Sequence, residues 1–125
     1  MATDWLSIQT ELNAQGCAVL PRLLSPDARA EAQGWWTNEN LFRSHVHMAR
    51  HGFGRGEYRY FRYPLPEPVA ALREALYPPL ASIANRWAER LGQDRRFPET
   101  HSAFLGECHA AAQVRPTPLL LRYQA

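Results

Sequence analysis

Apolar side chains recur at helical spacing near the start of the chain. Trp5, Ile8 and Leu12 fall on one side of a helix, and Gly16 stands where a helix commonly ends. A polar residue at position 3 or 4 can cap the first turn. The pattern therefore predicts a short amphipathic helix between these signals.

The pattern changes twice in the next stretch. Cys17–Leu20 is a brief apolar run that suits a strand. The sequence SPD at residues 25–27 then supplies a helix cap, a first-turn proline and a first-turn acid. We expect a short strand, followed by a second helix that runs to about Trp36.

The middle of the chain predicts helices that are punctuated by prolines. Val69–Leu76 has helical spacing, and the pair Pro78 and Pro79 should end it, because proline lacks the backbone donor that a helix interior requires. Apolar residues then recur over Leu80–Leu91 at helical spacing. We expect a separate helix here, with Trp87 buried in the core.

A further helix is expected to open at Pro98, since proline is favoured in a first turn. Cys108 is followed by His109, but adjacent residues on a helix point in different directions, so we expect a buried cysteine in place of a nucleophile with its base. The buried side of this helix is expected to carry four residues: Phe104, Leu105, Cys108 and Ala112.

Two stretches predict strands that could pair. Glu57–Tyr63 alternates so that Tyr58 and Tyr60 share one face. Leu119–Tyr123 follows two prolines and reads as a strand close to the end of the chain. Such a strand would leave an unpaired edge unless it joins the earlier ones, and we expect self-association through it. Together the elements predict an α+β domain with a mostly helical body.

Composition indicates one domain without a membrane segment. The 125 residues and 14.3 kDa suffice for a single domain, and no apolar run approaches the about 20 residues that cross a bilayer. The amino terminus shows no secretory signal, and Cys17 and Cys108 form no CxxC pair, so we expect a cytoplasmic protein with reduced thiols. The formal net charge of +2 is too small to indicate nucleic-acid binding by itself.

Residues 42–66, the arginine–aromatic segment, are the stretch that ordinary globular packing explains least. They contain five arginines, three histidines and six aromatic residues against a single acid, Glu57. Guanidinium groups need carboxylate, phosphate, aromatic or water partners. The segment is therefore either a network of internal ion pairs and arginine–tyrosine packing or a surface that receives an anion, and the spacing leaves both open.

The histidines of this segment can be placed in two ways. His45 and His47 would share a face in a strand, whereas His47 and His51 would share a face in a helix, and either spacing can support metal ligation. No Asp or Glu lies at a ligand spacing beside them, so local hydrogen bonding is favoured and no metal ligand is assigned. The alternating glycines at 52, 54 and 56 do not match the dinucleotide-binding fingerprint.

Three runs of the sequence carry a family resemblance. They are FRSHVHMARHGFGRGEYRYFRYPLP, LYPPLASIANRWAERLG and CHAAAQVRPTPLLLRY. Together they closely resemble the amino-terminal half of a bacterial family of iron(II)- and 2-oxoglutarate-dependent oxygenases, described as prolyl-4-hydroxylase-like and also linked to oxidative demethylation of nucleic acids. The resemblance implies the helical amino-terminal part of a double-stranded β-helix, or jelly roll. Residues 1–125 would then be a single incomplete domain, truncated before the metal-binding strands.

The resemblance also implies cofactors for the complete enzyme, Fe(II) and 2-oxoglutarate, which serve to hydroxylate a C–H bond. A tyrosine at the end of the early barrel strand faces the 2-oxoglutarate pocket in such enzymes, and Tyr123 takes that position; a core strand tyrosine is an equal alternative. The family's metal site needs a His-x-Asp or His-x-Glu pair plus a distant histidine, and none of the five histidines here has an acid two places on. We therefore assign no catalytic residue and expect ligands downstream of Ala125. This chain alone should bind neither cofactor tightly.

The substrate is left open by the sequence. Arg55 and Tyr58 are expected on the substrate side of the complete enzyme, because their segment is too polar for a core and too aromatic for an idle surface. A prolyl peptide, a damaged nucleic acid base and a small metabolite all fit. The alternative is a small non-enzymatic binding module, whose arginine and aromatic surface binds nucleic acid or a protein partner.

Overall fold

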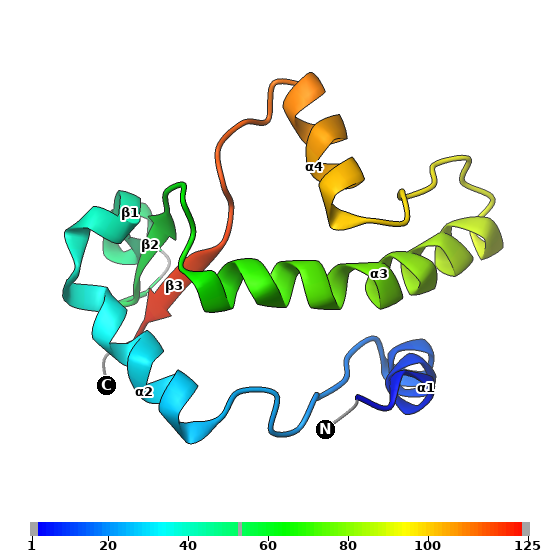
Figure 1. Cartoon of the computed structure of the whole chain (residues 1–125), viewed down its shortest axis with the longest axis horizontal. Coiled ribbons are helices and arrows are strands. Elements are labelled where there is room, and N and C mark those ends of the chain that lie inside the picture. Colours follow the sequence, from blue (N-terminus) through cyan, green and yellow to red (C-terminus); the bar gives the residue numbers. More distant parts are fainter. Residues whose placement is uncertain (1–2, 53, 124–125) are drawn as a thin grey trace.

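The computed structural model describes residues 3–52 and 54–123, and this part of the chain combines helices with one small sheet (Figure 1). The predicted α+β class is confirmed. Four α-helices are present: α1 (Trp5–Gln15), α2 (Pro26–Gly34), α3 (Glu67–Arg90) and α4 (His101–Ala110). Three strands accompany them: β1 (Phe42–His47), β2 (Glu57–Phe61) and β3 (Leu119–Arg122). Short 3-10 turns complete the fold: η1 (Trp35–Thr37), η2 (Glu39–Leu41) and η3 (Met48–His51).

Local signals place the first two helices where the sequence predicts them. The Asp4 carboxylate accepts from the backbone N–H of Ser7 at 3.1 Å and caps α1, while Gly16 ends α1 in the left-handed conformation, with a φ of 76°. The Ser25 hydroxyl caps α2 in the same way, accepting from the N–H of Ala28 at 3.1 Å. Both predictions are confirmed because each depends on neighbours in the chain.

The predicted strand at Cys17–Leu20 is wrong. These residues form part of the loop between α1 and α2, which runs apart from the sheet (Figure 1). Val19 is 76% exposed. A strand needs a partner for its backbone donors and acceptors, and the sheet consists of β1, β2 and β3 within the described residues.

The predicted interruption at Pro78 and Pro79 is also wrong, since α3 continues through both residues. Each proline removes a donor from the helix, but contacts on either side hold it against the connector to α4. The Tyr77 hydroxyl donates to the carbonyl of Pro98 at 2.8 Å. Asn85 makes two hydrogen bonds to the backbone of Phe97, at 2.6 and 3.0 Å. Tertiary contacts therefore keep α3 continuous despite the two prolines.

Two expectations about the helices around α3 need correction. Helix α4 begins at His101 and not at Pro98, because the Thr100 hydroxyl caps it by accepting from the N–H of Ala103 at 3.1 Å. Trp87 is half-buried, not buried. Its indole N–H donates to the side-chain oxygen of Asn13 on α1 at 2.7 Å, so the ring lies at the contact between α1 and α3.

The sheet is antiparallel, with the order β1–β2–β3. Its register pairs His45 with Arg59 and His47 with Glu57, and then Glu57 with Arg122 across the other edge of β2. The strand predicted for Glu57–Tyr63 is present but ends at Phe61. The strand placement of His45 and His47 holds, and β3 joins the earlier strands as an edge strand.

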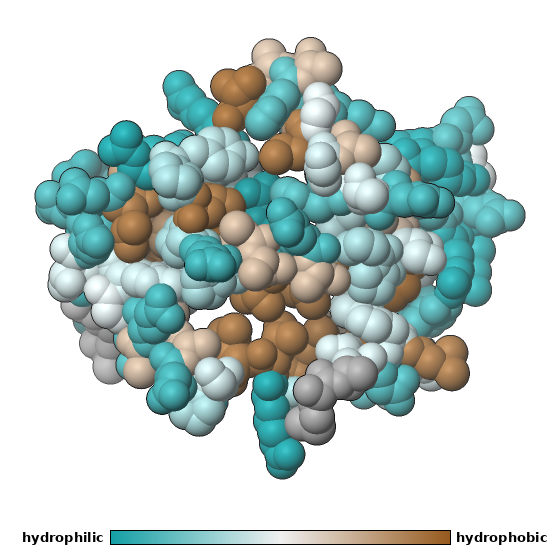
Figure 2. Space-filling model, in the orientation of Figure 1, coloured by the Kyte–Doolittle hydropathy of each residue, from teal (hydrophilic) through white to brown (hydrophobic). Residues whose placement is uncertain are grey.

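The packed interior is small for a chain of this length. The accessible surface is 9215 Å², against roughly 6800 Å² for a compact monomer of this mass. Hydrophobic residues show as patches among hydrophilic ones in Figure 2. Among the described residues, no helix is long and apolar enough to span a membrane. The buried apolar residues are Ile8, Trp36, Phe42, Phe61, Ala81, Ile83 and Ala88.

Candidate functional site

The two faces of the sheet carry different chemistry, because successive side chains of a strand point to opposite sides. We call them the histidine face and the tyrosine face. The histidine face carries His45, His47, Glu57, Arg59, Leu120 and Arg122. The tyrosine face carries Val46, Tyr58, Tyr60, Leu119 and Leu121, and the ring of Tyr123, just past the end of β3, lies against Gly56 on the same side.

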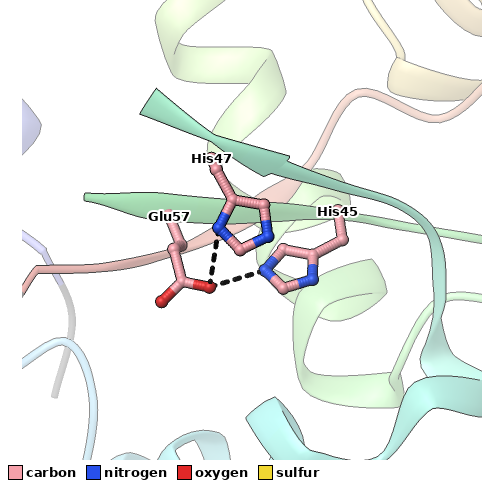
Figure 3. A group of neighbouring side chains, drawn as sticks. All are labelled: His45, His47 and Glu57. Carbon is pink, nitrogen blue, oxygen red and sulfur yellow. Dashed lines mark hydrogen bonds and ion pairs between the residues drawn. The ribbon is translucent and has the colours of Figure 1, made fainter. Parts of the chain in front are cut away.

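Glu57 lies at the centre of the histidine face. Its Oε1 atom is 2.8 Å from Nε2 of His45 and 3.4 Å from Nδ1 of His47, and Figure 3 shows both imidazoles turned toward it. Its Oε2 atom accepts from Nη2 of Arg122 at 2.8 Å. One carboxylate therefore connects side chains from all three strands. His45, His47 and Glu57 offer three possible metal-ligand atoms within 4.8 Å of one another.

The charges around Glu57 favour its ionised form. Hydrogen bonds from Arg122 and then from His45 lower the pKa of Glu57, against a smaller opposing effect of desolvation. The group is therefore a carboxylate at neutral pH. That state suits both an ion pair with Arg122 and coordination of a cation.

Trp36 packs over the histidine face from η1. The guanidinium carbon of Arg59 lies 4.9 Å from the Trp36 ring and that of Arg122 lies 4.5 Å from it, which are cation–π distances. The ring of His45 meets Trp36 edge-on at 5.7 Å. Nη2 of Arg59 also lies 3.4 Å from Nδ1 of His45. Arg59, from the arginine–aromatic segment, and Arg122, from β3, therefore pack on the same indole ring.

The tyrosine face is lined by aromatic rings from β2 and the end of β3. Tyr58 and Tyr60 meet edge-on at 5.5 Å. Arg43 lies 4.5 Å over Tyr60, and its guanidinium donates twice to the carbonyl of Pro116, at 3.1 and 2.9 Å. Tyr123 is 68% exposed, so its hydroxyl is accessible to a ligand.

The site residues predicted from the sequence are only partly brought together. Tyr58 and Tyr123 share the tyrosine face, while Arg55 lies exposed in the loop that precedes β2. The sequence interpretation missed Glu57 as a partner of His45 and His47 because Glu57 lies well beyond them along the chain. The register of the folded hairpin, which sequence spacing does not give, places Glu57 opposite His47.

Comparison with known protein families identifies the family of this chain. A family model described as "Oxygenase, catalysing oxidative methylation of damaged DNA" matches residues 56–125, which is more than half of the chain. The chain belongs to this oxygenase family, called Oxygenase-NA. The matched part of the Oxygenase-NA chain begins at Gly56 and includes β2, α3, α4 and β3, whereas His45 and His47 lie before it.

Two curated relatives of this Oxygenase-NA chain are longer proteins. Both are proteins of Mycobacterium tuberculosis named as uncharacterized, from two strains, and both are 41% identical over 63 residues. The alignment covers 50% of this chain and 27% of each relative, so the chain matches about a quarter of their length. No solved structure matches the chain significantly.

Proposed function

We propose that this chain is the amino-terminal part of an iron(II)- and 2-oxoglutarate-dependent oxygenase that acts on a damaged base of nucleic acid. Membership of the Oxygenase-NA family supports the reaction class and the substrate. The antiparallel sheet with flanking helices is compatible with the start of a prolyl-4-hydroxylase-like double-stranded β-helix. The observation that carries the proposal is that Tyr58 and Tyr123 lie on the same side of the sheet.

On this proposal the tyrosine face contacts both small molecules. The Tyr123 hydroxyl donates a hydrogen bond to a carboxylate of 2-oxoglutarate. Tyr58 presents a ring on which a base can stack, and Arg55 in the adjacent loop pairs with a phosphate. Bound iron supplies the oxidising chemistry, and the residues of this chain orient the two organic ligands.

The histidine face does not fit the catalytic iron of such an enzyme. Two histidines and a carboxylate are the right donor types. However, they lie on the opposite side of the sheet from Tyr123, and Arg59 and Arg122 place two further cations beside them. No catalytic step is therefore assigned to His45, His47 or Glu57. In this proposal the iron ligands lie outside residues 1–125, in a longer protein.

Nucleic-acid binding by the chain tests the proposal directly. Fluorescence anisotropy would follow a single-stranded oligodeoxynucleotide that carries one N-methylated base. We expect affinity that falls with salt, and Arg55→Ala should reduce the slope of log K against log salt by about 1. Tyr58→Ala should weaken binding by about 1–3 kcal/mol while the salt slope is kept. Arg29→Ala, on the exposed side of α2, is the matched control and should change neither value.

Two results would contradict the proposal: no binding of the oligonucleotide, or stronger binding of a prolyl peptide. The non-enzymatic binding module makes a different prediction for 2-oxoglutarate. Saturation-transfer NMR should detect weak binding of 2-oxoglutarate that decreases in Tyr123→Phe. Nucleic-acid binding without any response to 2-oxoglutarate would favour the binding module.

A further inference from the structure

We infer that His45, His47 and Glu57 form a separate binding site for a divalent transition-metal ion, with zinc the best match, on the sheet face opposite to Tyr58 and Tyr123. Such a site would clamp β1 to β2. It goes beyond the oxygenase proposal, because it neither supplies the catalytic iron nor depends on 2-oxoglutarate.

The distances from Glu57 to the two histidines are close to the ligand–ligand distances of a metal centre. Two ligands that each lie about 2.1 Å from a zinc ion, at angles between octahedral and tetrahedral values, are about 3.0–3.4 Å apart. Oε1 of Glu57 is 2.8 Å from Nε2 of His45 and 3.4 Å from Nδ1 of His47. All three ligand atoms lie within 4.8 Å of one another, so rotation of the imidazole rings is needed to bring them onto one ion. Figure 3 shows the two rings and the carboxylate converging on the same side of the hairpin.

The backbone fixes the three ligands before any metal arrives. His45 and His47 alternate on one strand, so both face the same side, and the register sets Glu57 directly opposite His47. Arg122 holds Oε2 of Glu57 at 2.8 Å and leaves Oε1 pointing at the imidazoles. Carboxylates that bind a metal are commonly held by an outer hydrogen-bond partner in this way.

Solvent can reach the site. The side chains of His45 and His47 are 34% and 43% exposed, whereas that of Glu57 is 14% exposed. An ion can therefore enter from water and keep one or more water ligands. Imidazole nitrogen with one carboxylate oxygen suits zinc, nickel and copper better than calcium or magnesium, which prefer oxygen ligands alone.

Arg59 opposes the metal and provides the sharpest test. A metal on Nε2 of His45 requires the ring proton on Nδ1, and Nδ1 lies 3.4 Å from Nη2 of Arg59, which is itself a donor. The two donors conflict, so metal binding must displace Arg59. Arg59→Gln offers a carbonyl acceptor at this position and should tighten metal binding about 10-fold, in the range that outer partners contribute.

Cobalt(II) provides a direct readout with the purified, metal-free protein. Added Co²⁺ should give visible absorption bands that titrate to one ion per chain and that Zn²⁺ removes. His45→Ala, His47→Ala and Glu57→Gln should each weaken binding at least about 10-fold. His109→Ala, at an exposed histidine on α4, is the matched control and should bind like the wild type.

Ring NMR signals in the wild type keep the test valid if a variant fails to fold. Zn²⁺ should shift the signals of His45 and His47 and leave those of His101 and His109 in place. Binding that is absent, or that persists unchanged in all three cluster variants, would overturn the inference, as would shifts confined to other histidines. These measurements use neither nucleic acid nor 2-oxoglutarate, so their failure leaves the oxygenase proposal standing.

Discussion

The ring of Tyr123 lies directly against Gly56, the residue before β2. A Cβ atom at position 56 would lie 2.7 Å from Cε1 of Tyr123 and 2.8 Å from Sδ of Met48. No side chain fits between them without movement. The hydrogen atom of this glycine is therefore what allows Tyr123, the proposed 2-oxoglutarate residue, to rest on the sheet.

Gly56→Ala should displace the Tyr123 ring and lower stability by about 1–3 kcal/mol, the usual cost of overpacking. Urea unfolding measures this change, and saturation-transfer NMR measures the accompanying loss of 2-oxoglutarate binding. Gly106→Ala is the matched control, because the space around Gly106 within α4 is open. It should stabilise the chain by about 0.5–1 kcal/mol. Equal behaviour of the two variants would contradict the close approach at Gly56.

Asn85 should contribute more to folding stability than a polar side chain usually does. Its side chain accepts from the N–H of Phe97 and donates to the Phe97 carbonyl, at partly buried positions. Asn85→Ala leaves both backbone groups without these partners and should cost about 1–3 kcal/mol in urea unfolding. Ser82→Ala, at an exposed position one turn earlier on α3, should change stability by less than about 0.5 kcal/mol. A small effect of Asn85→Ala would show that the connector is not held by this side chain.

The elements that the sequence predicts correctly are those that local chemistry decides. Asp4 and Ser25 cap their helices through backbone groups three residues away, so their roles can be read from the sequence. Pro78 and Trp87 were misjudged because contacts with the connector and with α1 determine their surroundings. Helix propensity alone carries no information about such partners.

The candidate sites also divide into features set by local geometry and features set by tertiary contacts. The alternation that puts Tyr58 and Tyr60 on one face follows from strand geometry and was predicted. The approach of Glu57 to His45 and His47 depends on a register that only the folded hairpin fixes. A sequence spacing rule cannot find a ligand that arrives from a neighbouring strand.

His101 should make stability depend on pH. Desolvation, and then the charge of Arg73, lower the pKa of His101 below its ordinary value of 6.5. Its folded form therefore binds a proton less readily than the unfolded chain. The stabilising contribution is complete above about pH 6.5 and is lost as the pH falls through the lowered folded pKa.

His101→Gln tests this linkage. Melting temperatures of the two proteins should differ most near about pH 8 and converge toward about pH 5, because only the wild type loses stability through this group. His109→Gln provides the comparison at another histidine of α4. A difference between wild type and His101→Gln that is constant with pH would contradict the lowered pKa.

The edge position of β3 should promote self-association. Its outer backbone groups face away from β2, and Leu121 on the tyrosine face is 47% exposed. Sedimentation velocity at increasing concentration should show larger species for the wild type. Leu121→Lys should reduce them, because a charge on an edge strand opposes pairing. Leu91→Lys, at a residue that is 71% exposed beyond α3, is the control, and an equal reduction there would indicate nonspecific hydrophobic association.

This chain should not convert 2-oxoglutarate to succinate, even if it binds zinc on the histidine face. Turnover needs iron with open positions beside the bound 2-oxoglutarate, and the cluster of His45, His47 and Glu57 lies across the sheet from Tyr123. The test adds iron(II), ascorbate and 2-oxoglutarate to the purified protein and follows succinate. No turnover above a protein-free control is expected. Succinate formation that His45→Ala or His47→Ala abolishes, and that His109→Ala leaves intact, would make the histidine face the catalytic metal site instead.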